Sequence, residues 1–172
     1  SLGEDTGGSI RLPAAYTGIV GVRPTWGLVS RHGIVPISWS MDAAGPMTRT
    51  VEDAAILLGV MAGPDPKDPL AARRPVPDYR AGLTGDVRGL RLGLIREWMD
   101  GEWMDPEVVA AVRAAAQTLQ SLGAVVEEVS IPFLLQIGAA ISVITGTEGA
   151  FATRRWLRER PQDIGMNLRR RW

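Results

Sequence analysis

A serine beside two glycines near the beginning of the chain could carry out acyl transfer. Gly7 and Gly8 lack a Cβ, so their backbone can adopt positive φ angles and direct successive N–H groups into one concave nest. A nest of this kind binds an anion, or an oxygen that becomes one. The Ser9 hydroxyl could attack a carbonyl carbon while these N–H groups hold the oxyanion. Taken alone, a Gly-Gly-Ser tripeptide is usually an ordinary turn, so the surrounding sequence must decide.

Two longer segments supply that context. Residues 5–25 read DTGGSIRLPAAYTGIVGVRPT, and residues 40–53 read SMDAAGPMTRTVED. Both closely resemble shared blocks of the amidase signature family and stand at that family's separation. The resemblance implies an α/β fold, part of the amidase signature fold, in which helices flank a mixed β-sheet. It also implies that residues 1–172 form a partial amidase domain.

The same resemblance implies roles for single residues. Ser9 matches the serine that the family acylates, and Asp5 and Arg11 match an ion pair that holds the turn in shape. The oxyanion hole would consist of the backbone N–H groups of Thr6, Gly7, Gly8 and Ser9. The family's catalytic unit also contains a lysine base and a serine preceded by a cis peptide bond, both upstream of the nucleophile. Because the chain begins eight residues before Ser9, we expect both to be missing and the isolated chain to be inactive or nearly so.

The chain offers few other groups that could activate Ser9. Its one lysine, Lys67, stands among prolines and aspartates, in a loop composition that cannot bury and deprotonate an ammonium group. Its one histidine, His32, lies in a polar Ser-Arg-His-Gly turn, which does not favour a positioned base. The absence of cysteine excludes a thiolate nucleophile and a cysteine metal site, and one histidine excludes a histidine-rich one. We expect neither a metal nor a cofactor.

Composition narrows the class of protein further. A chain of 172 residues with 45% hydrophobic and 22% charged residues and no net charge is typical of a globular domain. Neutrality argues against a dedicated nucleic-acid binder. The arginines of residues 154–171 are interpreted as a solvated helix face, with an RNA- or phosphate-binding edge as the alternative. The apolar run 131–145 is too short and too interrupted to span a bilayer.

These observations set the expected surroundings of the protein. We expect a small-molecule amide substrate, no membrane contact and a cytoplasmic location. No signal peptide is visible, but the chain starts at serine rather than methionine, so a removed or missing N-terminus could have held one. The sequence leaves open whether the protein is a homodimer.

Periodicity and capping signals predict the main elements. A helical turn near 13–16 and a strand over 19–23 follow the glycine turn, and Thr50 caps a helix that is apolar nearly all round and therefore predicted to be buried. Residues 64–89 are predicted to be a long surface connection. Strands near 90–95 and 124–129, with a helix that starts at Asp105 between them, predict one βαβ unit. The last predicted helix, 134–158, contains glycine breaks.

The expected reaction is hydrolysis of a carboxamide C–N bond through a Ser9 acyl-enzyme, with a backbone oxyanion hole. One alternative is the glutamine-hydrolysing subunit of a tRNA-dependent amidotransferase. Another is a non-catalytic fragment or an anion-binding module, in which the nest holds a carboxylate or phosphate and Ser9 donates a hydrogen bond. Glu4 departs from the family's small hydroxyl residue. A carboxylate there would repel the oxyanion, so Glu4 is predicted to point away, to solvent or to a partner.

Overall fold

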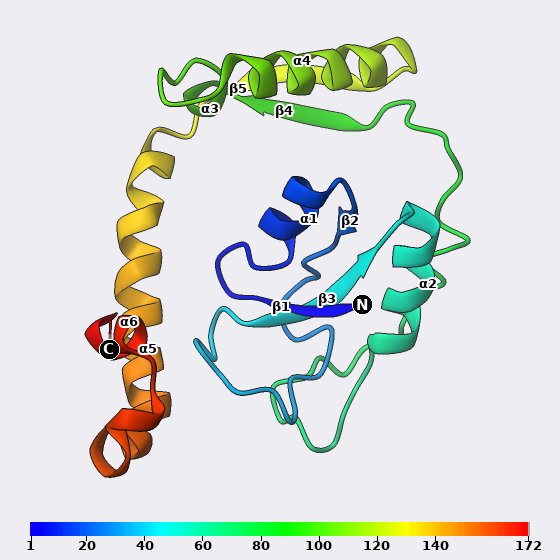
Figure 1. Ribbon diagram of the computed structural model, residues 1–172. Helices are drawn as coiled ribbons and strands as arrows, with labels where there is room; N and C mark the ends of the chain where they lie inside the picture. Colours follow the sequence, from blue (N-terminus) through cyan, green and yellow to red (C-terminus); the bar gives the residue numbers. More distant parts are fainter. Residues whose placement is uncertain (172) are drawn as a thin grey trace. The chain divides into compact units, whose positions relative to one another are not determined.

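The computed structural model describes residues 1–171 and divides the chain into two compact units (Figure 1). The first unit comprises Ser1–Leu83 together with the chain from Ile141 onward, and the second comprises Thr84–Ala140. The nucleophile turn predicted from the sequence lies in the first unit.

A three-stranded antiparallel sheet forms the centre of the first unit. Its order is β1 (Leu2–Asp5), β3 (Ala43–Thr48) and β2 (Val20–Gly21), with Leu2 opposite Pro46 and Asp5 opposite Ala43. The strand predicted over 19–23 is thus only two residues long. A Cβ on Gly45 would lie 2.1 Å from the Val22 carbonyl oxygen. Strand β3 therefore needs glycine at position 45, where it packs closely against the backbone of Val22.

Helix α2 (Val51–Met61) covers this sheet on one side. Thr50 is its N-cap, as predicted, and accepts a hydrogen bond from the Asp53 N–H at 3.0 Å. The prediction that this helix is buried all round is wrong, because only Ala54 and Leu58 are buried and Val60 is 78% exposed. One face packs on the core, and the apolar residues of the other face are exposed.

The core of the first unit lies between α2, β3 and the segments that follow β2. Four residues form its buried cluster: Leu28, Val29, Ala44 and Leu58. Partly buried side chains, including Tyr79, pack against it. Residues 64–89 contain no helix or strand, as predicted, but Tyr79 and the buried Asp68 show that this connection also closes part of the core.

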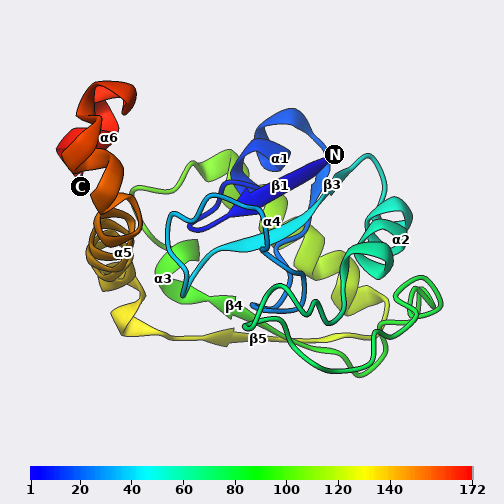
Figure 2. The ribbon, with the colours of Figure 1, turned by 90° about the horizontal axis from the view of Figure 1, so that it is seen from below.

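The second unit contains the predicted βαβ arrangement (Figure 2). Strands β4 (Arg91–Ile95) and β5 (Val125–Val129) are parallel, and α3 (Arg96–Met99) and α4 (Pro106–Ser121) connect them. Asp105 caps α4 by accepting the Glu107 N–H at 2.8 Å. The helical turn η1 (Pro132–Gln136) follows β5.

The long helix α5 (Ile137–Glu159) continues without a break through its glycines, so the predicted interruptions are wrong. The helical turn η2 (Pro161–Asp163) and α6 (Met166–Arg171) follow it. The stretch Pro132–Glu159 is long and apolar enough to cross a membrane by length and composition, whereas the apolar run recognised in the sequence covered only 131–145. A single stretch of this kind is weak evidence of a membrane span, because core helices of soluble proteins meet the same criterion of length and composition.

Candidate active site

The buried carboxylate of Asp5 holds the turn that follows β1. None of its side chain is exposed, and it accepts hydrogen bonds from the N–H groups of Gly8 at 2.7 Å and Ile10 at 3.2 Å. The Arg11 guanidinium donates to both oxygens, from Nε and Nη2, at 3.0 Å each. The ion pair that the sequence predicted between Asp5 and Arg11 is therefore present.

A second guanidinium, which the sequence did not reveal, supports the same carboxylate. Arg23 lies at the end of the β2 segment, with its Nε 3.5 Å from Asp5 Oδ1. It also donates to the carbonyl oxygens of Asp5 and Met41. Burial by itself would raise the pKa of Asp5, but the hydrogen bonds from Arg11 and the turn amides outweigh it and hold the pKa below its usual range.

The backbone of the turn presents Ser9 to the surface. Gly8 has a φ angle of 135°, and its N–H group is donated to Asp5. The N–H groups of Gly7 and Ser9 have no hydrogen-bond partner among residues 1–171, and both residues are exposed. Of the four amides predicted for the oxyanion hole, that of Gly8 is thus held by Asp5, that of Thr6 belongs to a buried residue, and those of Gly7 and Ser9 are open to a ligand. Gly8 supports the turn through its positive φ angle and does not offer a free N–H group.

Replacing Gly8 with alanine is expected to damage this turn. A Cβ at Gly8 would lie 2.9 Å from Leu12 Cδ1, and the positive φ angle would be strained in addition. We expect a loss of about 2 kcal/mol in the free energy of unfolding, measured by urea denaturation. Gly18→Ala is the matched control, because Gly18 also has a positive φ angle but an added Cβ there would meet no atom within 4 Å. An equal or smaller loss for Gly8→Ala than for Gly18→Ala would contradict this account.

A second network fixes the other side of the turn. The buried Thr6 hydroxyl donates to Asp42 Oδ1 at 2.6 Å, and Asp42 Oδ2 accepts the N–H groups of Ile37 and Ser38 at 2.9 Å each. The Ser38 hydroxyl then donates to the carboxylate of Glu148 on α5. Asp42 had no role that could be assigned from the sequence. Its two oxygens tie the nucleophile turn to the loop before β3.

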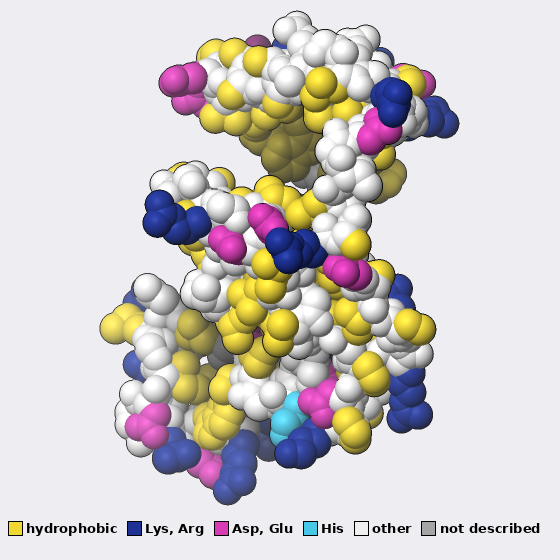
Figure 3. All heavy atoms as spheres, turned by 90° about the vertical axis from the view of Figure 1, so that its right-hand side faces the viewer, with side chains coloured by type: hydrophobic (Ala, Val, Ile, Leu, Met, Phe, Trp, Pro, Cys, Tyr) yellow, Lys and Arg dark blue, Asp and Glu magenta, His cyan; other side chains and the backbone are white. Residues whose placement is uncertain are grey.

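His32 and Lys67 give no sign of serving Ser9. Both are exposed, and His32 lies at the surface in the turn predicted for it (Figure 3). Both line a cavity that Glu4 also lines. Ser9 is not among the described residues that line this cavity. Trp39 lines the same cavity and packs its ring edge-on against Phe151. The described residues also contain no group of three or more His, Cys, Asp or Glu that could hold a metal ion.

Glu4 lines a cavity to which Ser9 does not contribute, as expected for a side chain predicted to point away from the oxyanion, but it is only partly exposed. Its Oε1 is buried without a hydrogen-bond partner in the described part of the chain. Burial first, and the nearby Asp42 carboxylate second, raise the pKa of Glu4 to about 7, although Arg31 opposes the shift. Strand alternation explains the position, because successive side chains of β1 leave opposite faces and Asp5 takes the face toward Arg11.

This raised pKa predicts how stability depends on pH. The folded protein binds the Glu4 proton more tightly than the unfolded chain, so Glu4 reduces stability as pH rises from about 4.5 to about 7. Glu4→Gln is therefore expected to raise Tm relative to the parent protein at pH 8, with a much smaller difference at pH 4.5. Thermal denaturation of both proteins at the two pH values measures this. A Tm gain that is the same at both would contradict the assignment.

Comparison with known proteins gives the family. A family model described as Amidase matches residues 1–169, and the chain therefore belongs to the amidase family. One subunit of the glutamyl-tRNA(Gln) amidotransferase of Thermosynechococcus vestitus is 54% identical over 132 residues, which cover 77% of this chain and 27% of that protein.

Solved structures agree with this membership. A chain from a vestigial complex that bears on the evolutionary origins of an s-triazine catabolic enzyme matches with a TM-score of 0.89 and 38% identity, over 99% of this chain and 36% of that one. Peptide amidase from Stenotrophomonas maltophilia matches with a TM-score of 0.78 and 40% identity, over 91% of this chain and 32% of that one. The predicted α/β amidase signature fold is confirmed. The chain spans about a quarter to a third of the length of these proteins.

Proposed function

We propose that the turn after β1 supplies the nucleophile, Ser9, and part of the oxyanion hole, the N–H groups of Gly7 and Ser9, for hydrolysis of a carboxamide C–N bond. The observation that carries the proposal is the turn itself, in which Ser9 is exposed beside two open amides while Asp5 holds the backbone beneath them. Membership of the amidase family and the likeness to a peptide amidase support the same reaction.

The steps follow from these positions. Ser9 Oγ attacks the carbonyl carbon and loses its proton to a base, and the carbonyl oxygen becomes an oxyanion held by the N–H groups of Gly7 and Ser9. The C–N bond then breaks and the nitrogen leaves as ammonia after taking up a proton, which leaves an acyl group on Ser9. Water hydrolyses that ester and frees the carboxylic acid. No base contacts Ser9 within residues 1–171, so we infer that the base comes from outside them.

The charge of the turn suits this sequence of steps. The guanidinium groups of Arg11 and Arg23 compensate the Asp5 carboxylate, so the carboxylate nearest in sequence to the oxyanion is neutralised. Glu4, the other acidic residue of β1, faces a different cavity. The turn therefore offers donors to a developing negative charge without an opposing carboxylate. Removing one oxyanion-hole donor typically raises the activation free energy of the reaction by about 3 kcal/mol.

Glutamine hydrolysis within a tRNA-dependent amidotransferase is the second candidate. It is favoured by the 54% identity, over 132 residues, to one subunit of such an enzyme. Both candidates use the same acyl-enzyme and differ in the amide bound and in where the ammonia goes.

Ammonia release separates these candidates. The gene product that contains these residues is incubated with glutamine and, separately, with a peptide that ends in a C-terminal carboxamide, and ammonia is quantified. Release from either substrate supports carboxamide hydrolysis, and the preferred substrate assigns the branch. A protein that releases ammonia from neither, yet binds phosphate or acetate in a manner unaffected by Ser9→Ala, would instead be the anion-binding module.

A further inference from the structure

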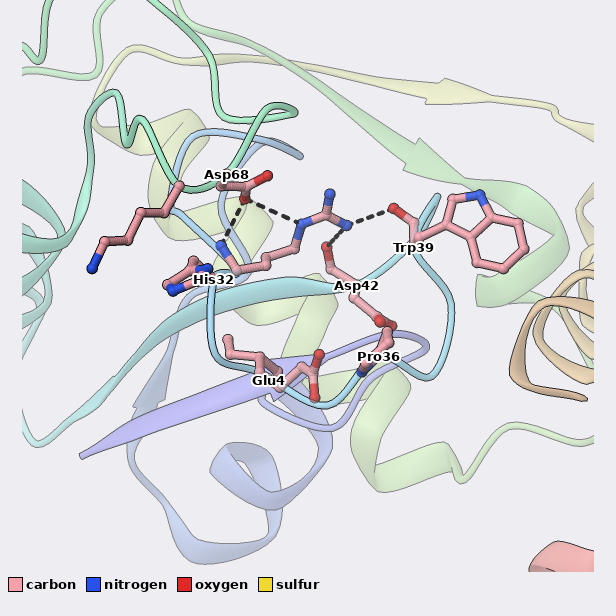
Figure 4. Close-up of a pocket in the computed structure, with 9 residues that line it drawn as sticks. Glu4, His32, Pro36, Trp39, Asp42 and Asp68 are labelled. Atoms are coloured by element: carbon pink, nitrogen blue, oxygen red, sulfur yellow. Dashed lines mark hydrogen bonds and ion pairs between the residues drawn. The ribbon is translucent and has the colours of Figure 1, made fainter. Parts of the chain in front are cut away.

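A cavity of about 200 Å³ in the first unit is not used by the proposed reaction (Figure 4). Its ionisable lining residues are Glu4, Arg31, His32, Asp42, Lys67 and Asp68. Two polar atoms of these residues, Glu4 Oε1 and Arg31 Nε, are buried and have no hydrogen-bond partner within residues 1–171. The Arg31 side chain is only 10% exposed. Buried polar atoms are nearly always paired, so two in one cavity indicate a missing partner.

The other polar groups in the wall are already engaged. Asp42 accepts three hydrogen bonds through its two oxygens. Asp68 accepts the N–H groups of Arg31 and Leu70, and its Oδ2 lies 3.9 Å from Arg31 Nε, too far for a hydrogen bond. Arg31 Nη1 donates to the carbonyl oxygens of Trp39 and Asp42. Glu4 is thus the carboxylate with a free oxygen, and Arg31 Nε is a free donor.

The charges of the wall do not balance when Glu4 is ionised. Glu4, Asp42 and Asp68 contribute three negative charges, and Arg31 and Lys67 contribute two positive ones, which leaves one negative charge in excess among these five residues. Either a proton on Glu4 or one bound cation restores neutrality. The raised pKa of Glu4 is the response expected when the cation is missing.

We propose that this cavity binds a small molecule that carries a primary ammonium group and, a few bonds away, an oxygen acceptor. The ammonium group donates to Glu4 Oε1 and supplies the missing positive charge. The oxygen accepts from Arg31 Nε. Ile34, Pro36 and Trp39 complete the wall and suit a short carbon chain between the two polar ends.

This site differs from the proposed active site in both place and chemistry. Ser9 does not line the cavity, and binding here involves no covalent step. A bare metal ion fits poorly, because the described residues contain no cluster of three or more metal-ligating side chains and a metal would leave Arg31 Nε without an acceptor. Asp42 connects the two sites, since it lines the cavity and accepts the Thr6 hydroxyl of the nucleophile turn.

Three probes of equal length test the proposal by calorimetric titration of the full chain. 2-Methoxyethylamine carries both groups, n-butylamine lacks the oxygen, and 2-methoxyethanol lacks the charge. At pH 8 we expect 2-methoxyethylamine to bind, n-butylamine to bind about threefold to tenfold more weakly, and 2-methoxyethanol to show no saturable binding. Both amines are protonated at pH 6 and pH 8. The ionised fraction of Glu4 rises about tenfold over this range, so the Kd of 2-methoxyethylamine should fall about tenfold.

Glu4→Gln keeps the shape of the side chain and removes its charge. It is expected to weaken binding of 2-methoxyethylamine at least tenfold at pH 8 and to remove most of the dependence on pH, while His32 remains in the cavity wall. Glu52→Gln, the same change at an exposed residue paired with Arg80, should leave both unchanged. The proposal is overturned by equal binding of 2-methoxyethanol, by equal or tighter binding of n-butylamine, or by a Kd that neither pH nor Glu4→Gln changes. If Glu4→Gln does not fold, the probe series and pH dependence of the parent protein still decide.

Discussion

Replacing Ser9 with alanine is expected to lower kcat/KM for carboxamide hydrolysis by a factor on the order of 10⁴ to 10⁶ in the gene product that contains this chain. The substitution removes the oxygen that forms the acyl-enzyme, while the amides of Gly7 and Ser9 remain to bind an oxyanion. The residual rate should therefore still exceed that of the uncatalysed reaction. Steady-state ammonia release measures both quantities.

The stability of the protein should not change with this substitution. Ser9 is exposed, and its hydroxyl forms no hydrogen bond among residues 1–171, so Tm should stay within a degree or two of the parent value. Ser121→Ala, at an exposed serine of α4, is the matched control and should leave both activity and Tm unchanged. A Ser9→Ala protein that retains more than a tenth of the parent kcat/KM would rule out Ser9 as the nucleophile.

Asp5→Asn is expected to cause the largest loss of stability. The side chain is fully buried, and its charge is the counterpart of two guanidinium groups and the acceptor for the amides of the turn. An asparagine amide of the same shape offers one acceptor oxygen and turns two donors toward cations. We expect the free energy of unfolding to fall by about 3 kcal/mol, the low end for a broken buried ion pair, because Arg11 itself is half exposed.

Urea denaturation at neutral pH measures this loss. Asp86→Asn removes a carboxylate from an exposed pair with Arg88 and is expected to change stability by no more than about 0.5 kcal/mol. The pKa of Asp5 is depressed, so its contribution is present above the pKa of the unfolded chain, near 4, and is lost as pH falls further. The difference between Asp5→Asn and the parent protein should thus shrink in acid. Equal losses for the two variants would show that Asp5 does not hold the turn.

Local signals predicted the elements whose causes are local. Thr50 and Asp105 are N-cap residues in the structure because their side chains bond to amides two or three residues away. The periodic stripe of the helix between two apolar strands predicted the βαβ unit correctly. Glycine was misleading in α5, where helix propensity alone predicts breaks that the continuous helix does not contain.

The sheet that positions the active site was missed for a physical reason. Strand β3 contains Gly45 and Pro46, residues that normally argue against a central strand, and β1 contains Gly3. A Cβ on Gly3 would lie 2.8 Å from Ile10, and one on Gly45 would meet the Val22 backbone. Glycine is therefore required by close packing between segments that are distant in sequence. No propensity scale contains that information.

In the candidate site too, contacts between residues close in sequence could be predicted, whereas contacts between distant residues could not. Asp5 and Arg11 are close in sequence, and their pair was predicted correctly. The contacts from Arg23 to Asp5 and from Thr6 to Asp42 join residues 18 and 36 positions apart, and only the fold brings them together. Glu4 was predicted to point away from the oxyanion, and it lines a cavity to which Ser9 does not contribute, but the burial of its Oε1 was not predicted. Strand alternation places Glu4 on the face opposite Asp5, but the cavity on that face is formed by residues distant in sequence, such as Arg31 and Asp68.

The residue that a fluorophosphonate labels shows whether Ser9 is the nucleophile. The gene product that contains these residues is treated with a fluorophosphonate, digested and analysed by mass spectrometry, with the isolated chain treated in parallel. The account predicts one phosphonyl adduct, on Ser9, which is lost in Ser9→Ala and absent from the isolated chain because no base reaches the serine there. An adduct on any other residue, or rapid labelling of the isolated chain, would contradict it.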